Sequence, residues 1–98
     1  MHIERIERGL AVHGELDAAT ADEFDIALQE ALLETEGDFV LDLCGLTFMD
    51  SGGVNELLRA RSLLGREERS LIVRCADGPV RRVLDLVGIA DLFELRTG

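Results

Sequence analysis

The chain has 98 residues, a formal net charge of −10, and four Phe but no Trp or Tyr; 47% of its residues are hydrophobic. This size and hydrophobic content predict one globular domain over residues 1–98 and exclude a disordered chain. The acidic balance and the lack of Trp and Tyr argue against binding nucleic acid. The charged N-terminus excludes a signal peptide, and no apolar run approaches the roughly 20 residues of a membrane-spanning helix. We therefore expect a cytoplasmic protein without membrane insertion.

The negative charge is concentrated in one part of the chain. Between Arg8 and Arg59 there are twelve acidic residues and no Lys or Arg. Such a field repels nucleic acid and anionic lipid and attracts a basic protein surface. The alternative explanation is that each of these acidic residues serves only to keep the protein soluble.

The first half of the chain predicts a hairpin followed by a helix. Residues 3–7 and 10–16 flank Arg8 and Gly9, as in a short antiparallel pair at a sheet edge. Asp17 or Thr20 is then expected to cap a helix, and Thr20 with Glu23 fits a capping box. The helix is indicated by apolar residues at helical spacing, which are Ala21, Phe24, Leu28, Ala31 and Leu32.

The second half alternates strands and helices. Apolar residues 39–43 predict a buried strand, a helix follows from about 52 to 65, and residues 71–75 predict another strand. Pro79 opens a third helix that ends at Gly88, and a short last strand falls within 92–95. Helices between strands imply parallel pairing, so the fold class is α/β with a mixed sheet.

The two cysteines fall at the ends of two predicted buried strands. We expect Cys44 and Cys75 to be reduced and to act as small hydrophobic residues, although a disulfide between them is conceivable. Their spacing with the histidines does not indicate a metal site. No cofactor or metal is therefore expected.

The most informative stretch is the turn at residues 47–53, between the central strand and the next helix. A helix that begins there presents free N–H groups and the positive end of its dipole, and Ser51 lies at that junction. Met49 occupies the first glycine of a nucleophile elbow, and His2 and His13 lie in the distant hairpin, so a serine nucleophile is not indicated. No Lys follows the glycines, which excludes a phosphate-binding P-loop. Ordinary helix capping is the simpler interpretation of these residues alone.

Three segments together resemble the STAS domain of bacterial anti-sigma factor antagonists. They are Gly14-Glu-Leu-Asp17, then Leu41-Asp-Leu with Leu46-Thr-Phe-Met-Asp-Ser-x-Gly53, and Pro79-Val-Arg-Arg-Val-Leu followed by Gly88. The resemblance covers nearly the whole chain and implies a single-domain STAS-like fold. It implies a non-enzymatic protein whose unphosphorylated form binds an anti-sigma factor with serine kinase activity, which frees a sigma factor. The kinase then phosphorylates the serine in the turn, the complex dissociates, and a phosphatase restores the antagonist.

Carried onto this sequence, the resemblance places the phosphorylated residue at Ser51, with Asp50 beside it and Asp17 nearby in space. The partner-binding candidates are Asp17, Asp50, Gly52, Gly53, Asn55 and Glu56, of which Asn55 and Glu56 are expected to be exposed. The family commonly has a second Ser where this chain has Gly52. That departure keeps open a second function, a STAS scaffold subunit of a transporter or signalling complex that is never phosphorylated. A small enzyme using Asp17, Asp50 and Ser51 is the least favoured hypothesis.

The second helix carries more apolar residues than one face requires. They predict either a binding surface or a wide stripe that packs on the core.

Overall fold

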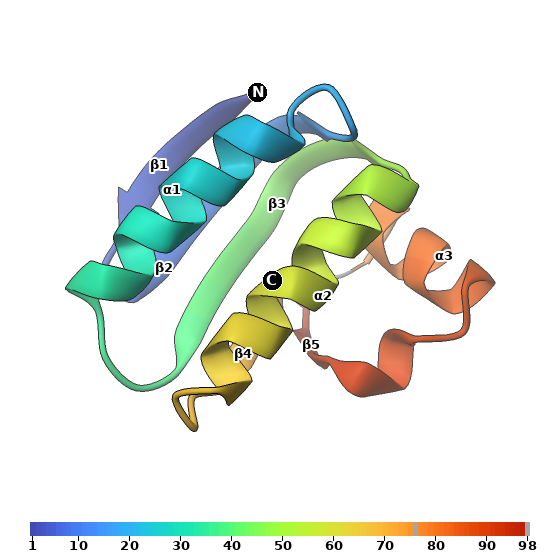
Figure 1. The fold of residues 1–98 in the computed structure, drawn as a ribbon. Helices are drawn as coiled ribbons and strands as arrows, with labels where there is room; N and C mark the ends of the chain where they lie inside the picture. Colours follow the sequence, from blue (N-terminus) through green and yellow to red (C-terminus); the bar gives the residue numbers. More distant parts are fainter. Residues whose placement is uncertain (76, 98) are drawn as a thin grey trace.

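A computed structural model of the chain describes residues 1–75 and 77–97 and shows an α/β fold (Figure 1). The elements are β1 (His2–Ile6), β2 (Gly9–Leu16), α1 (Ala21–Glu34), β3 (Phe39–Met49), α2 (Ser51–Gly65), β4 (Leu71–Arg74), α3 (Pro79–Leu86), the 3₁₀ turn η1 (Ala90–Leu92) and β5 (Glu94–Arg96). The five strands form one sheet in the order β1-β2-β3-β4-β5. β1 pairs antiparallel with β2, and every later pair is parallel. The predicted hairpin, element order and mixed sheet are confirmed.

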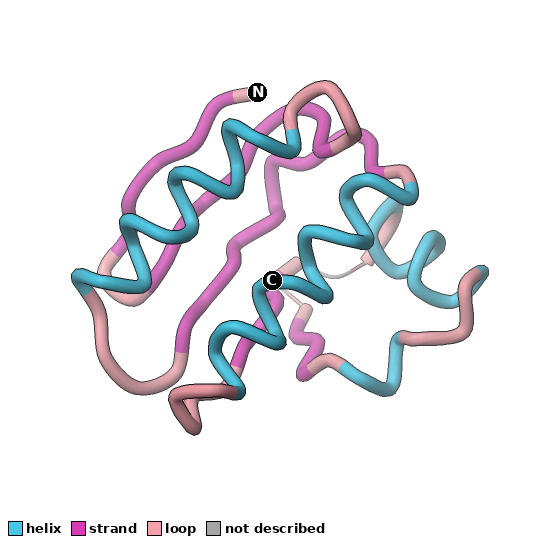
Figure 2. The backbone as a smooth tube through the Cα atoms, viewed as in Figure 1, coloured by secondary structure: helices cyan, strands magenta, loops and turns pink. Residues whose placement is uncertain are grey.

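The core lies between the sheet and the helices. α1 and α2 lie side by side over the same face of the sheet (Figures 1 and 2). Leu10, Leu41 and Val73, one from each of the three central strands, are fully buried there, as are Phe24 of α1 and Leu57 of α2. This apolar layer drives folding and fixes both helices on the sheet.

The central strand β3 is longer than the apolar run predicts, extending from Phe39 to Met49. Its pairing with β2 shifts twice, once between Ala11 and His13 and again between Gly14 and Glu15. At the first shift the carboxylate of Asp42 accepts the backbone N–H of Cys44 at 2.9 Å. This bond satisfies an amide that the irregular ladder leaves without its usual partner, as expected at a β-bulge. β3 therefore reaches the helix N-terminus at Ser51 without leaving the sheet.

Arg69, in the loop between α2 and β4, ties that loop to the end of α1. Its side chain is only 7% exposed. It donates to the carbonyl of Gly37 at 2.8 Å, to the carbonyl of Leu32 at 3.1 Å and to the hydroxyl of Thr35 at 2.8 Å. α1 has no basic residue in its own last turn, so Arg69 supplies the positive charge that a helix C-terminus favours.

Two local predictions are wrong. Within the described residues no side chain caps α1; the Thr20 hydroxyl instead accepts the N–H of Asp17 at 3.0 Å and donates to the carbonyl of Glu15 at 3.0 Å. The capping box with Glu23 therefore does not form. Cys44 and Cys75 are joined by a disulfide, and Cys44 is exposed because it lies at the bulge of β3 rather than on the core side.

No helix within residues 1–75 and 77–97 is long and apolar enough to span a bilayer.

Candidate functional site

The sheet places the two candidate turns beside each other. Leu16 and Met49, the last residues of β2 and β3, are register partners in the parallel pair. The turns that begin with Asp17 and Asp50 therefore leave the sheet from the same edge, and both can be seen there in Figure 2. Parallel strands commonly gather functional groups at this edge.

Asp50 is the N-cap of α2. Its backbone is extended, and its carboxylate accepts the N–H of Gly52 at 2.8 Å and that of Gly53 at 3.4 Å. Its carbonyl accepts the N–H of Val54 at 3.0 Å, which begins the helical pattern. The expectation that the helix N-terminus offers free N–H groups is therefore wrong for two of them, because Asp50 already binds both.

Gly52 and Gly53 lie where no side chain fits. A Cβ on Gly52 would lie 2.6 Å from the backbone nitrogen of Ala18 and 3.0 Å from the carbonyl carbon of Asp17. A Cβ on Gly53 would lie 2.5 Å from the carbonyl oxygen of Leu16. The start of α2 thus packs directly on the turn that follows β2. The second Ser that the family commonly has at this position would not fit in place of Gly52 in this structure.

Ser51 is the first residue of α2, and its side chain is exposed. No hydrogen bond to the Ser51 hydroxyl is made by any described residue. Both histidines lie on the hairpin, where their rings are 5.6 Å apart and His13 Nε2 is 3.1 Å from Glu4 Oε1. Ser51 is therefore accessible to another protein, and neither histidine activates it.

Asp17 lies beside Gly52 through its backbone, and its carboxylate binds within its own turn. Its Oδ1 accepts the N–H groups of Ala19 at 2.9 Å and Thr20 at 3.1 Å, and the Thr20 hydroxyl is 3.2 Å away. The carboxylate thus shapes its own turn, on which Gly52 rests. Through this turn Asp17 helps to position the start of α2.

Asn55 and Glu56 differ in their surroundings. Asn55 is exposed, as predicted. Glu56 is only partly exposed, and its Oε2 is buried with no hydrogen-bond partner among the described residues. Burial raises the pKa of Glu56, and the nearby negative charge of Asp25 adds to this effect. Glu56 lies at the interface between α1 and α2, where Arg59 Nε donates to Asp25 Oδ1 at 2.7 Å.

Phe48 is a site residue that the sequence did not reveal. It is 46% exposed, although it directly precedes the buried Met49 and the turn. Its exposure follows from the second register shift of β3, which an alternating pattern does not indicate.

The extra apolar residues of α2 are accounted for by the core. Leu58 and Leu63 are partly buried and pack against it, and α2 contributes no residue to the exposed large hydrophobic side chains. The wide core stripe is therefore the better interpretation of this helix.

Comparisons with known proteins agree with the fold. A family model described as "Mlab, STAS domain" matches residues 2–96. An anti-sigma F factor antagonist of Paenibacillus polymyxa is 34% identical over 83 residues, which cover 84% of this chain and 71% of the relative. An anti-sigma-B factor antagonist of Staphylococcus epidermidis is 26% identical over 87 residues, covering 89% of this chain and 81% of the relative.

A solved structure gives the same result in three dimensions. An anti-sigma factor antagonist from Mycobacterium paratuberculosis superimposes with a TM-score of 0.76 and 26% sequence identity, covering 97% of this chain and 82% of that one. With a family model matched along almost its whole length and relatives of this kind, the chain belongs to the STAS-domain family.

Proposed function

We propose that this protein is an anti-sigma factor antagonist controlled by phosphorylation of Ser51. The observation that carries the proposal is the exposed Ser51 hydroxyl at the start of α2, between a capping aspartate and two glycines that admit no side chain. Relatives at 34% and 26% identity are named anti-sigma factor antagonists, which supports the partner class. In the unphosphorylated form the chain binds an anti-sigma factor with serine kinase activity and so frees a sigma factor.

The proposed binding surface surrounds Ser51. It consists of exposed or partly exposed residues from the end of β3, both turns and the first part of α2, namely Asp17, Ala18, Phe48, Asp50, Ser51 and Asn55. Gly52 and Gly53 contribute by holding the two turns together. Phe48 offers apolar area at the rim, and Asn55 follows Ser51 by one helical turn. In the form that binds the kinase, Ser51 is neutral and lies beside the carboxylate of Asp50.

Phosphorylation changes the charge of that surface without disturbing the fold. It adds about −1.5 to −2 charges at an exposed position. Since Asp50 already occupies the N–H groups of Gly52 and Gly53, the phosphate stays outside the helix end and faces the partner. A doubly charged phosphate at an assumed distance of about 8 Å from a carboxylate of the partner costs roughly 2–4 kcal/mol at an effective dielectric constant of about 20 to 40. That corresponds to an affinity loss of about 30- to 1,000-fold.

The site assignment is tested by incubating the protein with a serine-kinase anti-sigma factor from the same genome, ATP and Mg²⁺, followed by peptide mass spectrometry. We expect one phosphate on Ser51, none on Ser51→Ala, and normal labelling of Ser62→Ala, which removes an exposed serine of the same helix. Labelling of Ser51→Ala would contradict the assignment. Stable binding without phosphate transfer would favour the scaffold function, and adding a phosphatase to the labelled protein tests reversal.

A further inference from the structure

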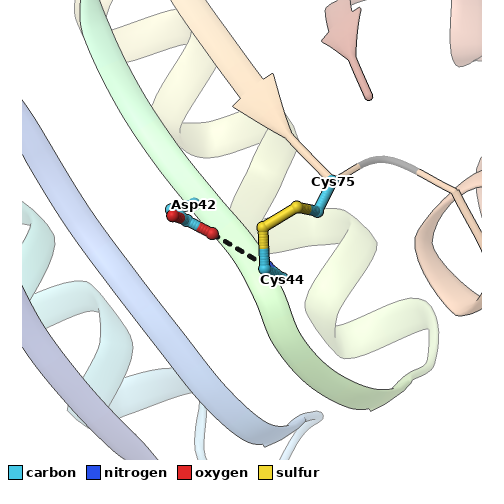
Figure 3. Close-up of side chains that lie close together, drawn as sticks. All are labelled: Asp42, Cys44 and Cys75. Carbon is cyan, nitrogen blue, oxygen red and sulfur yellow. Dashed lines mark hydrogen bonds between the residues drawn. A yellow bond between two sulfur atoms is a disulfide. The ribbon is translucent and has the colours of Figure 1, made fainter. Parts of the chain in front are cut away.

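A disulfide joins the middle of β3 to the residue that follows β4 (Figure 3). It links Cys44 and Cys75, whose Cα atoms are 4.8 Å apart and which are separated by 31 positions in the sequence. This Cα separation lies within the range that a disulfide spans without backbone movement. Neither cysteine belongs to the surface proposed above for the anti-sigma factor.

The bridge is accessible from solvent. Figure 3 shows the bridge between β3 and the end of β4. Cys44 is exposed and Cys75 is partly exposed. Exposed disulfides exchange with small thiols more readily than buried structural ones. We therefore expect a low-molecular-weight thiol to reach the bridge in the folded protein.

The bridge lies four positions before the start of α3 in the sequence. Cys75 has a φ of +57°, a left-handed conformation that non-glycine residues seldom adopt. α3 has only eight residues, two of which, Val80 and Leu84, are buried. Within the described residues no side chain caps its N-terminus at Gly78. Such a short helix has little stability of its own, and the bridge at Cys75 adds a covalent link to β3 close to its start.

We propose that Cys44 and Cys75 form a reversible thiol–disulfide couple, a redox modification site that tethers the α3 segment to β3 when oxidised. A low-molecular-weight disulfide such as oxidised glutathione serves as the oxidant. One protein thiolate attacks the oxidised glutathione and forms a mixed disulfide with one glutathione. The other glutathione leaves as a thiol. The second protein thiolate then displaces the glutathione of the mixed disulfide. In sum, two protein thiols become one disulfide while the glutathione disulfide becomes two thiols, and excess reduced glutathione reverses both steps.

The test equilibrates the whole chain, without denaturant, in glutathione buffers of increasing oxidised fraction. Alkylation of free thiols and intact-mass measurement then count the reduced molecules. We expect a complete and reversible transition between a dithiol and a form lighter by two hydrogens. A bridge that resists excess reduced glutathione in the folded protein would contradict the proposal, as would thiols that stay free in the most oxidising buffer.

Hydrogen exchange tests the structural consequence in the same samples. We expect amides of α3 to exchange at least about tenfold faster in the reduced protein, with α1 unchanged. Cys44→Ser should show the reduced pattern in every buffer. Equal exchange of α3 in oxidised and reduced wild type would refute the tether, and this comparison does not depend on the variant's folding.

A metal site is the competing outcome, because the Asp42 carboxylate and both cysteine sulfurs lie within 4.8 Å of one another. The reduced protein is therefore incubated with Zn²⁺, desalted and analysed for zinc. Stoichiometric zinc in the wild type, lost in both Cys44→Ser and Asp42→Asn, would overturn the redox assignment.

Discussion

Gly52 gives the sharpest test of how the candidate site is built. In Gly52→Ala the new methyl carbon would lie 2.6 Å from the backbone nitrogen of Ala18 and 3.0 Å from its Cα. These are backbone atoms of the turn after β2, so no side-chain rotation relieves the contact. That turn is itself fixed by the hydrogen bonds of the Asp17 carboxylate to Ala19 and Thr20. The start of α2 and the turn must therefore move apart.

The expected loss combines two opposing effects. Overpacking costs about 1–3 kcal/mol, and we expect about 2–3 kcal/mol here because only backbone atoms can move to relieve the contact; replacing Gly by Ala in a helix recovers about 1 kcal/mol. The net change in the free energy of unfolding is a loss of about 1–2 kcal/mol. For a domain of this length that lowers Tm by about 5–15 °C.

The matched control is Gly65→Ala, at the other end of the same helix. A Cβ there meets nothing within 4 Å, and Gly65 is the last helical residue. Urea denaturation followed by circular dichroism should show Gly52→Ala destabilised and Gly65→Ala unchanged or slightly stabilised. A Gly52→Ala protein as stable as the wild type, or equal losses in both variants, would refute the close approach of the two turns.

Three further predictions concern Asp50, Glu56 and Arg69. Asp50→Ala removes the cap of α2 and should cost about 1 kcal/mol in urea denaturation, whereas Asp50→Asn keeps the acceptor and should cost only a few tenths; equal losses in the two variants would argue against the capping bond. Burial and the charge of Asp25 raise the pKa of Glu56, so the folded state holds this proton more tightly than the unfolded state. The wild type therefore loses stability relative to Glu56→Gln as pH rises through the Glu56 pKa, and a constant difference between the two proteins from pH 4 to pH 7 would contradict the shift. Arg69→Ala removes three hydrogen bonds at the end of α1 and should lower the free energy of unfolding by about 2–4 kcal/mol. The control Arg81→Ala breaks a surface pair with Asp85 and should leave the urea midpoint nearly unchanged. Similar midpoints for both arginine variants would show that the Arg69 contacts contribute little.

The sequence predicts the fold well where apolar periodicity and turn residues agree. The hairpin around Gly9, the helix opened by Pro79 and its end at Gly88 are all found, with Gly88 at a φ of +74°. The full length of β3 could not be predicted, because its inward residues change from a spacing of two to a spacing of three after Leu43. Two register shifts produce that change, and they depend on the pairing with β2 and on the bond between Asp42 and Cys44.

The candidate site was predictable in its location but not in its contacts. The motif placed Ser51 at a helix start, and the structure has it there with Asp50 as the cap. The partial burial of Glu56 beside Asp25 and the exposure of Phe48 at the register shift with β2 depend on neighbours distant in sequence. The contacts of Arg69 were missed, and the cysteines were expected to be reduced, for the same reason, since each link joins segments more than 30 positions apart.

The most direct test of the account is the affinity of a serine-kinase anti-sigma factor for this protein with and without phosphate on Ser51. The two forms are separated by ion exchange, checked by circular dichroism, and titrated with the partner by calorimetry in the presence of ADP. We predict identical folds and a Kd at least about 30-fold higher for the phosphorylated form, from the repulsion derived above. Equal Kd values for the two folded forms would contradict the central claim that Ser51 acts as a charge switch.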